Sequence, residues 1–343
     1  MTTARATVRP PSPPATLASV FRCPSCSVPL RLRWSEGQPR CESCGWTAGQ
    51  RDGVLDFVRD PRRAEERGHY EAEYSAQAPV SRASRQPADV SGPWTHPAKR
   101  GNSALLHELG ELEGRVVLLL GNGRSEKEMY FLTRRPALLV FSDLAAAGVG
   151  DVARRFELGD ESERVCFAAI DALELPIADE TVDLVYGNAI VHHLPDLDRC
   201  LAEAARVLKP GGRTVFMDAA YAPLWQGAKS TWLRPLMRLS HHLYPRSPED
   251  RRYTIEGGFR ESELGPKIRA LGGEPFFHRH GFLFYLWQRG ARRLLPASLA
   301  GFGEHPGIAR LLTRLDERLA RFEVVRRNQV RLVWGFTKAP SAT

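Results

Sequence analysis

Long apolar runs and cysteines are both scarce in this sequence, and each scarcity excludes a class of protein. No stretch reaches the 18 or more consecutive apolar residues that a membrane-spanning helix requires, so no transmembrane segment is predicted. Six cysteines in 343 residues, four of them in two C-x-x-C pairs, are too few and too unevenly placed for a disulfide scaffold. This cysteine usage is typical of a reducing compartment, and we expect a cytoplasmic protein.

Acidic residues are missing from the N-terminal region, where the first carboxylate is Glu36. A transit peptide would share this absence, but four prolines between residues 10 and 14 oppose the amphipathic helix of such a peptide. We therefore expect residues 1–18 to form a disordered tail. The net charge of +8 permits nucleic acid or peripheral contact with an anionic membrane. Because the arginines are scattered along the sequence rather than grouped in runs, a solvated basic surface is the favoured interpretation.

Two cysteine pairs, Cys23 with Cys26 and Cys41 with Cys44, lie 14 residues apart. Paired C-x-x-C segments at about this separation indicate a zinc site, because each tight turn presents two thiolates to one tetrahedral ion. Four thiolates leave no coordination position for water, so a structural zinc is expected rather than a catalytic one.

The stretch from Arg115 to Asp143 organises the rest of the chain. An apolar run over residues 116–120 precedes Gly121-Asn122-Gly123, and a second apolar run ends at Asp143. A buried strand, a glycine turn, a helical run and an acid 22 residues after the first glycine together predict a nucleoside-binding βαβ unit. A dinucleotide fingerprint would have a third glycine, but Glu126 occupies its position.

Four short segments then follow the glycine turn in order, which makes five pieces in all: residues 171–176, 183–188, 192–195 and 208–212. This series resembles class I S-adenosylmethionine-dependent methyltransferases, particularly the branch that includes the quinone-biosynthesis enzymes. The resemblance is dense from about 115 to 218 and weaker towards both ends. It implies a methyltransferase enzyme with S-adenosylmethionine as cofactor.

Strand and helix patterns alternate through this region, which indicates an α/β fold with a parallel, doubly wound sheet. The resemblance implies a seven-stranded Rossmann-like methyltransferase sheet that closes with an antiparallel pair, for which 275–286 and 329–336 are the candidates. We expect a disordered tail (1–18), a zinc ribbon (19–59), a helical connector and linker or lid (60–101), and a methyltransferase domain (102–343). An insertion over about 219–325 would roof the substrate site. The ribbon resembles the small zinc-ribbon partners of tRNA and release-factor methyltransferases.

The resemblance also implies roles for individual residues at the carboxyl ends of the strands, where ligands of such sheets bind. The turn of Gly121, Asn122 and Gly123 would approach the methionine end of the cofactor, and Asp143 would bind the ribose hydroxyls. Asp171 would accept from the adenine amino group. The backbone N–H of Ala172 would meet an adenine ring nitrogen, and Asn188 would lie near the sulfonium.

Two residues depart from the family pattern at the methionine end. Leu119 stands where the family usually has an acid that helps to hold the methionine ammonium, and Ser125 replaces a common glycine. A hydrogen bond to a charged group contributes roughly 1.5–3 kcal/mol. We therefore expect the cofactor to bind more weakly than in relatives with that acid.

His192 and His193 follow the fourth strand and are candidates for a general base, which is needed when the acceptor must lose a proton. Similar His-Leu-Pro segments also serve as packing elements in the family, so both interpretations stay open.

Three functions compete: methylation of a small molecule such as a specialised metabolite, quinone or lipid-linked precursor; methylation of RNA gripped by the ribbon; and a non-catalytic binding protein. The insertion favours the first and the basic charge the second, whereas Leu119 and Ser125 motivate the third. The sequence leaves the oligomeric state open.

Overall fold

The computed structural model describes residues 20–30, 40–51, 53–77, 85–90, 100–230, 258–287 and 305–340, without the side chains of 100–104 and 228–230. The expected tail and much of the expected linker and roof lie outside these residues. Within the described part, no helix is both long enough and apolar enough to cross a membrane. The chain forms two compact units, which are described separately: residues 1–89 with 112–183, and residues 90–111 with 184–343.

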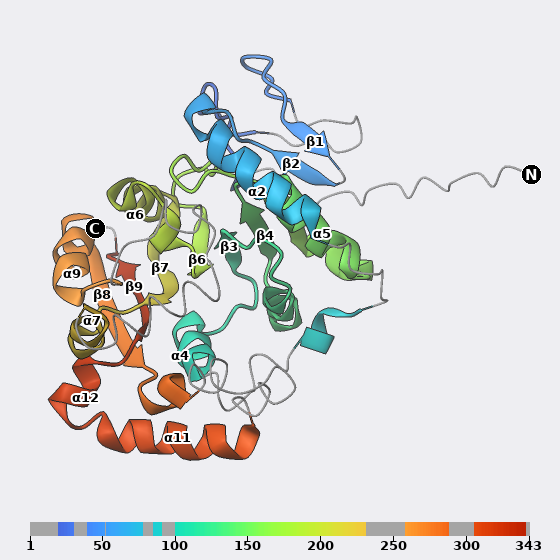
Figure 1. The fold of residues 1–343 in the computed structure, drawn as a ribbon. Coiled ribbons are helices and arrows are strands. Elements are labelled where there is room, and N and C mark those ends of the chain that lie inside the picture. Colours follow the sequence, from blue (N-terminus) through green and yellow to red (C-terminus); the bar gives the residue numbers. More distant parts are fainter. Residues whose placement is uncertain are drawn as a thin grey trace, which may run out of the picture. The chain divides into compact units, whose positions relative to one another are not determined.

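The first unit contains five strands in the order β1-β2-β5-β4-β3 (Figure 1). Their bounds are β1 Gly49–Arg51, β2 Val54–Asp56, β3 Val116–Leu120, β4 Leu138–Asp143 and β5 Val165–Ala169. The strands β3, β4 and β5 pair in parallel, and every residue in them is buried. Their near-continuous Val, Leu and Phe content is what a parallel strand covered on both faces requires.

The ribbon is continuous with this sheet. Its hairpin strand β2 pairs in parallel with β5, and Val54 and Leu55 are buried in that pairing. The ribbon also reaches β5 through the Phe57 N–H, which donates to the Ala169 carbonyl at 3.0 Å. The predicted ribbon therefore adds two strands to the sheet of the first unit, because its short hairpin buries its apolar residues against a strand edge that would otherwise be unpaired.

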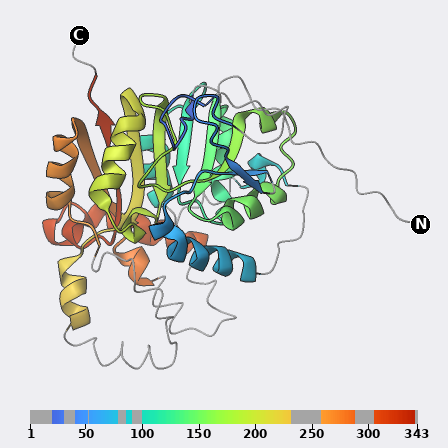
Figure 2. The ribbon, with the colours of Figure 1, turned by 90° about the horizontal axis from the view of Figure 1, so that it is seen from above.

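The described residues of the first unit also form α-helices and 3-10 helices. The helices α2 (Ala64–Ala76) and α5 (Ala146–Arg155) lie alongside each other in both views (Figures 1 and 2). The 3-10 helices are η2 (Pro61–Arg63), η3 (Pro87–Val90), whose last residue belongs to the second unit, η4 (Lys127–Arg134) and η5 (Gly159–Arg164). The helical run expected after the glycine turn forms the 3-10 helix η4. The Ser125 N–H donates to the Asn122 carbonyl, and the Met129 N–H donates to the Glu126 carbonyl. Both hydrogen bonds span three residues, as in a 3-10 helix.

The second unit contains four strands in the order β6-β7-β9-β8. Their bounds are β6 Val182–Asn188, of which the first two residues belong to the first unit, β7 Leu208–Ala219, β8 Gly273–His280 and β9 Arg331–Lys338. The pairs β7–β9 and β8–β9 are antiparallel, which confirms the expected antiparallel closure. The strand expected over 275–286 is shorter, because the Asp316 carboxylate accepts from the backbone N–H groups of residues 282–284 and starts a helical turn there.

The helices of the second unit include α6 (Leu197–Val207), whose apolar face is buried at Cys200, Leu201 and Ala204. The other elements are listed by their bounds: α4 Arg100–Leu109, η6 Val191–His193, α7 Pro223–Ser230, α9 Glu261–Ala270, α11 Pro306–Leu319 and α12 Glu323–Arg327. Asp196 caps α6 by accepting from the Arg199 N–H at 2.9 Å. The two units hold the seven strands of the predicted sheet, and the doubly wound α/β methyltransferase fold is confirmed.

Candidate functional site

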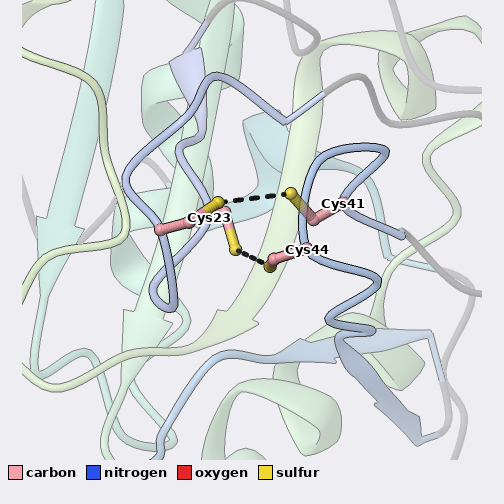
Figure 3. Close-up of side chains that lie close together, drawn as sticks. Cys23, Cys41 and Cys44 are labelled. Carbon is pink, nitrogen blue, oxygen red and sulfur yellow. Dashed lines mark hydrogen bonds between the residues drawn. The ribbon is translucent and has the colours of Figure 1, made fainter.

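Four cysteine sulfurs gather in the ribbon (Figure 3). The Sγ atoms of Cys23 and Cys44 lie 3.6 Å apart, those of Cys26 and Cys41 lie 3.5 Å apart, and all four lie within 4.8 Å of one another. A tetrahedral zinc with Zn–S distances of about 2.3 Å holds its sulfurs about 3.8 Å apart. The four side chains that the sequence indicated therefore fit one zinc ion.

Backbone N–H groups also prepare the two knuckles for a metal. The Ser25 N–H donates to the Cys23 sulfur at 3.3 Å. Hydrogen bonds from the backbone N–H groups of Cys44 and Ser43 lower the pKa of the Cys41 thiol to about 7, against the opposing effect of burial. Gly45 follows the second knuckle at φ 75°, a left-handed turn that closes the loop back to the Cys41 carbonyl. The cluster combines close sulfurs with N–H donors, as a zinc thiolate site requires.

Asp143 lies at the carboxyl end of β4 and is buried. Its carboxylate accepts from the backbone N–H of Gly123 at 2.8 Å and of Ala145 at 3.0 Å, one on each oxygen. Burial raises the pKa of the carboxyl from 3.8 to about 6, and the two N–H groups oppose that rise. Each oxygen keeps a lone pair, so the carboxylate is held in place and can still accept from hydroxyl groups.

The glycine turn begins directly after β3. Gly121 and Gly123 have φ of 59° and 51°, in the left-handed region that favours glycine. A Cβ built on Gly123 would come within 2.8 Å of the Tyr74 hydroxyl. Leu119 is fully buried in the strand before the turn. An apolar core residue therefore occupies the position where the family usually has an acid. The turn thus has the backbone conformation that lets a ligand approach closely, but it lacks the acid that would hold the methionine ammonium.

Asp171 lies two residues beyond β5, also buried. One carboxylate oxygen accepts from the Leu173 N–H at 3.0 Å. The other oxygen lies 3.0 Å from Nε of Arg63, a buried arginine in η2 that also pairs with Glu66. Ala172 is buried beside this cluster. The sequence predicted a helical connector here and did not identify Arg63 and Glu66 as site residues.

Helix α2 covers the strand ends near Asp143. Glu71 accepts from the N–H groups of Ala146 and Ala147 at 2.7 and 3.1 Å, and so caps the N-terminus of α5. Burial, with a smaller contribution from Asp143, raises the pKa of the Tyr74 hydroxyl well above its usual range. The helix of the expected connector, with Tyr74, therefore lies over the candidate ribose acid.

The second unit holds Asn188, at the end of β6, and the two histidines of η6. His192 Nδ1 lies 2.7 Å from an oxygen of Asp218, which is fully buried at the end of β7. The other oxygen of Asp218 accepts from the indole N–H of the buried Trp334 at 3.2 Å. The rings of His192 and His193 lie 4.0 Å apart. The contact orients the His192 ring, and because an ionised carboxylate can only accept, Nδ1 would be the donor and Nε2 the nitrogen left to accept.

Comparison with known proteins agrees with this geometry. Residues 118–216 match the model of a methyltransferase domain family. The chain is 32% identical over 110 residues to 27-O-demethylrifamycin SV methyltransferase from Amycolatopsis mediterranei, covering 32% of the chain and 40% of the relative. It is 30% identical over 126 residues to the ubiquinone/menaquinone biosynthesis C-methyltransferase UbiE of Paracoccus denitrificans, covering 36% and 49%.

A third relative is the demethylmenaquinone methyltransferase of Thermobifida fusca, 36% identical over 111 residues, with 32% of the chain and 46% of the relative covered. The chain thus spans less than half the length of these curated relatives. All three similarities are to enzymes that transfer methyl groups to small molecules, and the matched family model covers β3 to most of β7. Over residues 118–216 the chain thus matches a methyltransferase domain.

Proposed function

We propose that the protein transfers a methyl group from S-adenosylmethionine to a small-molecule acceptor. The observation that carries this proposal is the placement of Asp143 and Asp171 at the carboxyl ends of two neighbouring parallel strands, β4 and β5. Ligands of doubly wound sheets bind at this edge. The matched methyltransferase domain, residues 118–216, includes both acids.

The residues present fit the adenosine half of the cofactor. Asp143, fixed by the Gly123 and Ala145 N–H groups, is suited to accept from the two ribose hydroxyls. Asp171 is suited to accept from the adenine amino group, and a buried Arg63 N–H beside it has no hydrogen-bond acceptor of its own. These contacts would anchor the cofactor from the adenine to the ribose.

The methionine half is held by fewer charges. Gly121, Asn122 and Gly123 supply the turn, but Leu119 offers no carboxylate to the ammonium. Losing one hydrogen bond to a charged group costs roughly 1.5–3 kcal/mol, or about ten- to a hundred-fold in affinity. We infer that the cofactor binds through its adenosine half and more weakly than in relatives with the acid.

His192 is proposed as the general base for the acceptor. The bound cofactor supplies an activated methyl group, so transfer depends on positioning and on removing a proton where the acceptor carries one. With Nδ1 held by Asp218, His192 Nε2 is suited to take that proton, and the Asp218 carboxylate then stabilises the resulting imidazolium. Asn188 is proposed to lie near the sulfonium, and His193 to pack against His192.

The acceptor class is inferred from the three relatives, whose names refer to a rifamycin and to quinones. A partly apolar small molecule is the proposed acceptor. A zinc ion on the four cysteines is proposed as structural, and the division into tail, ribbon, connector and methyltransferase domain with a roof remains a prediction. RNA methylation and a non-catalytic role remain the competing functions.

The test is calorimetric titration of the full chain with S-adenosylhomocysteine, followed by a methyl-transfer assay with labelled S-adenosylmethionine. The acceptors are a small-molecule extract and total RNA, each at low and at physiological salt. Binding with label in the small-molecule fraction is expected. No binding would leave the non-catalytic role. Label in RNA alone, with binding that weakens steeply as salt rises, would replace the small-molecule proposal by RNA methylation.

A further inference from the structure

The connection between the zinc ribbon and the methyltransferase sheet carries a residue that the family comparison does not cover. Arg63 lies outside the matched segment, in the three-residue helix η2 that follows the ribbon. Its side chain is only 9% exposed, although arginine is almost never fully buried without a partner. Such burial in a connector calls for an explanation.

The partners of Arg63 are two buried carboxylates. Its Nη1 lies 2.5 Å from Glu66, one turn further along the chain, and its Nε lies 3.0 Å from Asp171. Burial raises the pKa of the Glu66 carboxyl, Asp171 raises it further, and Arg63 opposes both. One guanidinium therefore lies between two acids that would repel each other without it.

The Nε–H of Arg63 provides a second, independent observation. It is buried and has no hydrogen-bond acceptor, because Asp171 lies close to it but off the line that a hydrogen bond requires. A buried donor without an acceptor is costly, and native proteins rarely keep one without a reason. The Asp171 oxygen beside Arg63 therefore accepts no hydrogen bond from this N–H and stays open to a donor of the ligand, such as the adenine amino group.

The ribbon holds Arg63 in this position. Arg59 donates to the Pro24 carbonyl inside the first cysteine knuckle at 2.7 Å, and Asp60 caps η2 through the Arg62 N–H at 2.9 Å. Phe57 stacks on Phe21 with ring centroids 5.0 Å apart. The path from the cysteine knuckle to Arg63 is thus short and bonded throughout.

We propose that Arg63 is a positioning residue of the adenine site, contributed by the ribbon connector, which holds the Asp171 carboxylate in place to accept from the adenine amino group. This inference rests on the proposed binding of S-adenosylmethionine. It makes the ribbon part of the cofactor site as well as a structural module. Glu66 shares the guanidinium but does not meet the ligand.

The experiment compares binding of S-adenosylhomocysteine with binding of its inosine analogue, in which a carbonyl replaces the adenine amino group, by calorimetry on the full zinc-loaded chain. Wild type is expected to prefer the adenine ligand. Arg63→Met should weaken that ligand by about tenfold and reduce the preference, because Asp171 is no longer held. Arg63→Lys keeps a cation and should recover part of the affinity for the adenine ligand and part of the preference for it.

The matched control is Arg62→Met, which removes the neighbouring arginine, whose side chain is 82% exposed and paired with Asp60. It should bind both ligands as wild type does, and Glu66→Gln should keep the preference because Arg63 still faces Asp171. Arg63→Met with wild-type affinity, or with equal losses for both ligands and an unchanged preference, would overturn the inference. If Arg63→Met does not fold, Arg63→Lys decides by the same comparison. Wild type that binds neither ligand would instead refute the proposed function.

Discussion

At the scale of single residues, the candidate site depends on how a few buried polar groups are held. Asp143, Asp171 and Asp218 are each buried, and each is oriented by N–H donors or by a cation from another segment. An oriented carboxylate presents its remaining lone pairs in a defined direction, so little ordering is left for the ligand to impose. Preorganisation of this kind is what binding and proton transfer both require.

Asp143 leads to a prediction about pH. Burial raises the pKa of its carboxyl from 3.8 to about 6, so this group stabilises the folded chain most below pH 3.8 and the contribution is lost as the pH rises through 6. Ribose hydroxyls bind the ionised form. We therefore expect the affinity for S-adenosylhomocysteine to increase between pH 5 and 7, with a proton released on binding near pH 6.

Calorimetry in two buffers of different ionisation enthalpy measures the number of protons released on binding. Asp143→Asn should bind roughly 1.5–3 kcal/mol more weakly at pH 7 and lose the pH dependence. A wild-type affinity that stays constant from pH 5 to 7 would contradict the assignment of Asp143 to the ribose.

His192 leads to a prediction about rate. Because Asp218 orients its ring, His192→Asn should lower kcat by about 10²- to 10⁴-fold for an acceptor that loses a proton, with the affinity for S-adenosylhomocysteine unchanged. His193→Asn is the control, since His193 packs against His192 and should have a much smaller effect. Equal losses of kcat in the two variants would point to packing rather than to base catalysis.

At the scale of secondary-structure elements, α2 makes polar contacts with other elements that could not be predicted from its sequence. The helix has a weakly apolar face, yet three of its side chains bond to other elements: Glu66 to η2, Glu71 to α5 and Arg67 to Asp56 of β2. Charged contacts thus fasten the helix where apolar burial alone would not.

The cap that Glu71 provides for α5 is testable. Because its carboxylate accepts from two N–H groups at that N-terminus, Glu71→Ala should lower the free energy of unfolding by about 1 kcal/mol. The matched variant Glu73→Ala removes an exposed carboxylate of the same helix, paired at 3.8 Å with His69, and should change stability by less than about 0.5 kcal/mol. Urea unfolding of both variants measures the difference, and equal effects would exclude capping as the cause.

At the scale of the whole molecule, the ribbon and the methyltransferase sheet of the first unit share a hydrogen-bonded edge. The pairing of β2 with β5 places the ribbon beside the strand that leads to Asp171. A module of this size has little core of its own, so its metal would supply most of its folding free energy, roughly 10–16 kcal/mol in comparable peptides. Folding of the ribbon and order at the strand end are therefore expected to be coupled.

Metal removal tests this coupling. We expect one zinc per chain, and removing it with a chelator should unfold the ribbon and weaken S-adenosylhomocysteine binding while the rest of the sheet stays folded. Metal analysis, circular dichroism and calorimetry on the same sample give the three measurements, and re-addition of zinc should restore binding. Zinc-free protein with undiminished affinity would show that the ribbon and the cofactor site are independent.

The sequence by itself determined the features that depend on local pattern. Apolar runs after a glycine turn specify buried parallel strands, alternation with amphipathic helices specifies a doubly wound sheet, and paired C-x-x-C segments specify a four-sulfur cluster. The acids Asp143 and Asp171 could be found because strand ends are visible in the sequence. These inferences need only neighbouring residues, because side-chain periodicity, turn-forming glycines and the C-x-x-C spacing are local properties of the sequence.

Only the tertiary structure decided which distant residues meet. The pairing of β2 with β5, the Arg63–Asp171 ion pair and the His192–Asp218 contact join segments 26 to more than 100 residues apart. No periodicity encodes such contacts, because they arise when separate elements pack and buried charges must find partners. Arg63 and Glu66, which the sequence placed in a helical connector without partners, are buried for this reason.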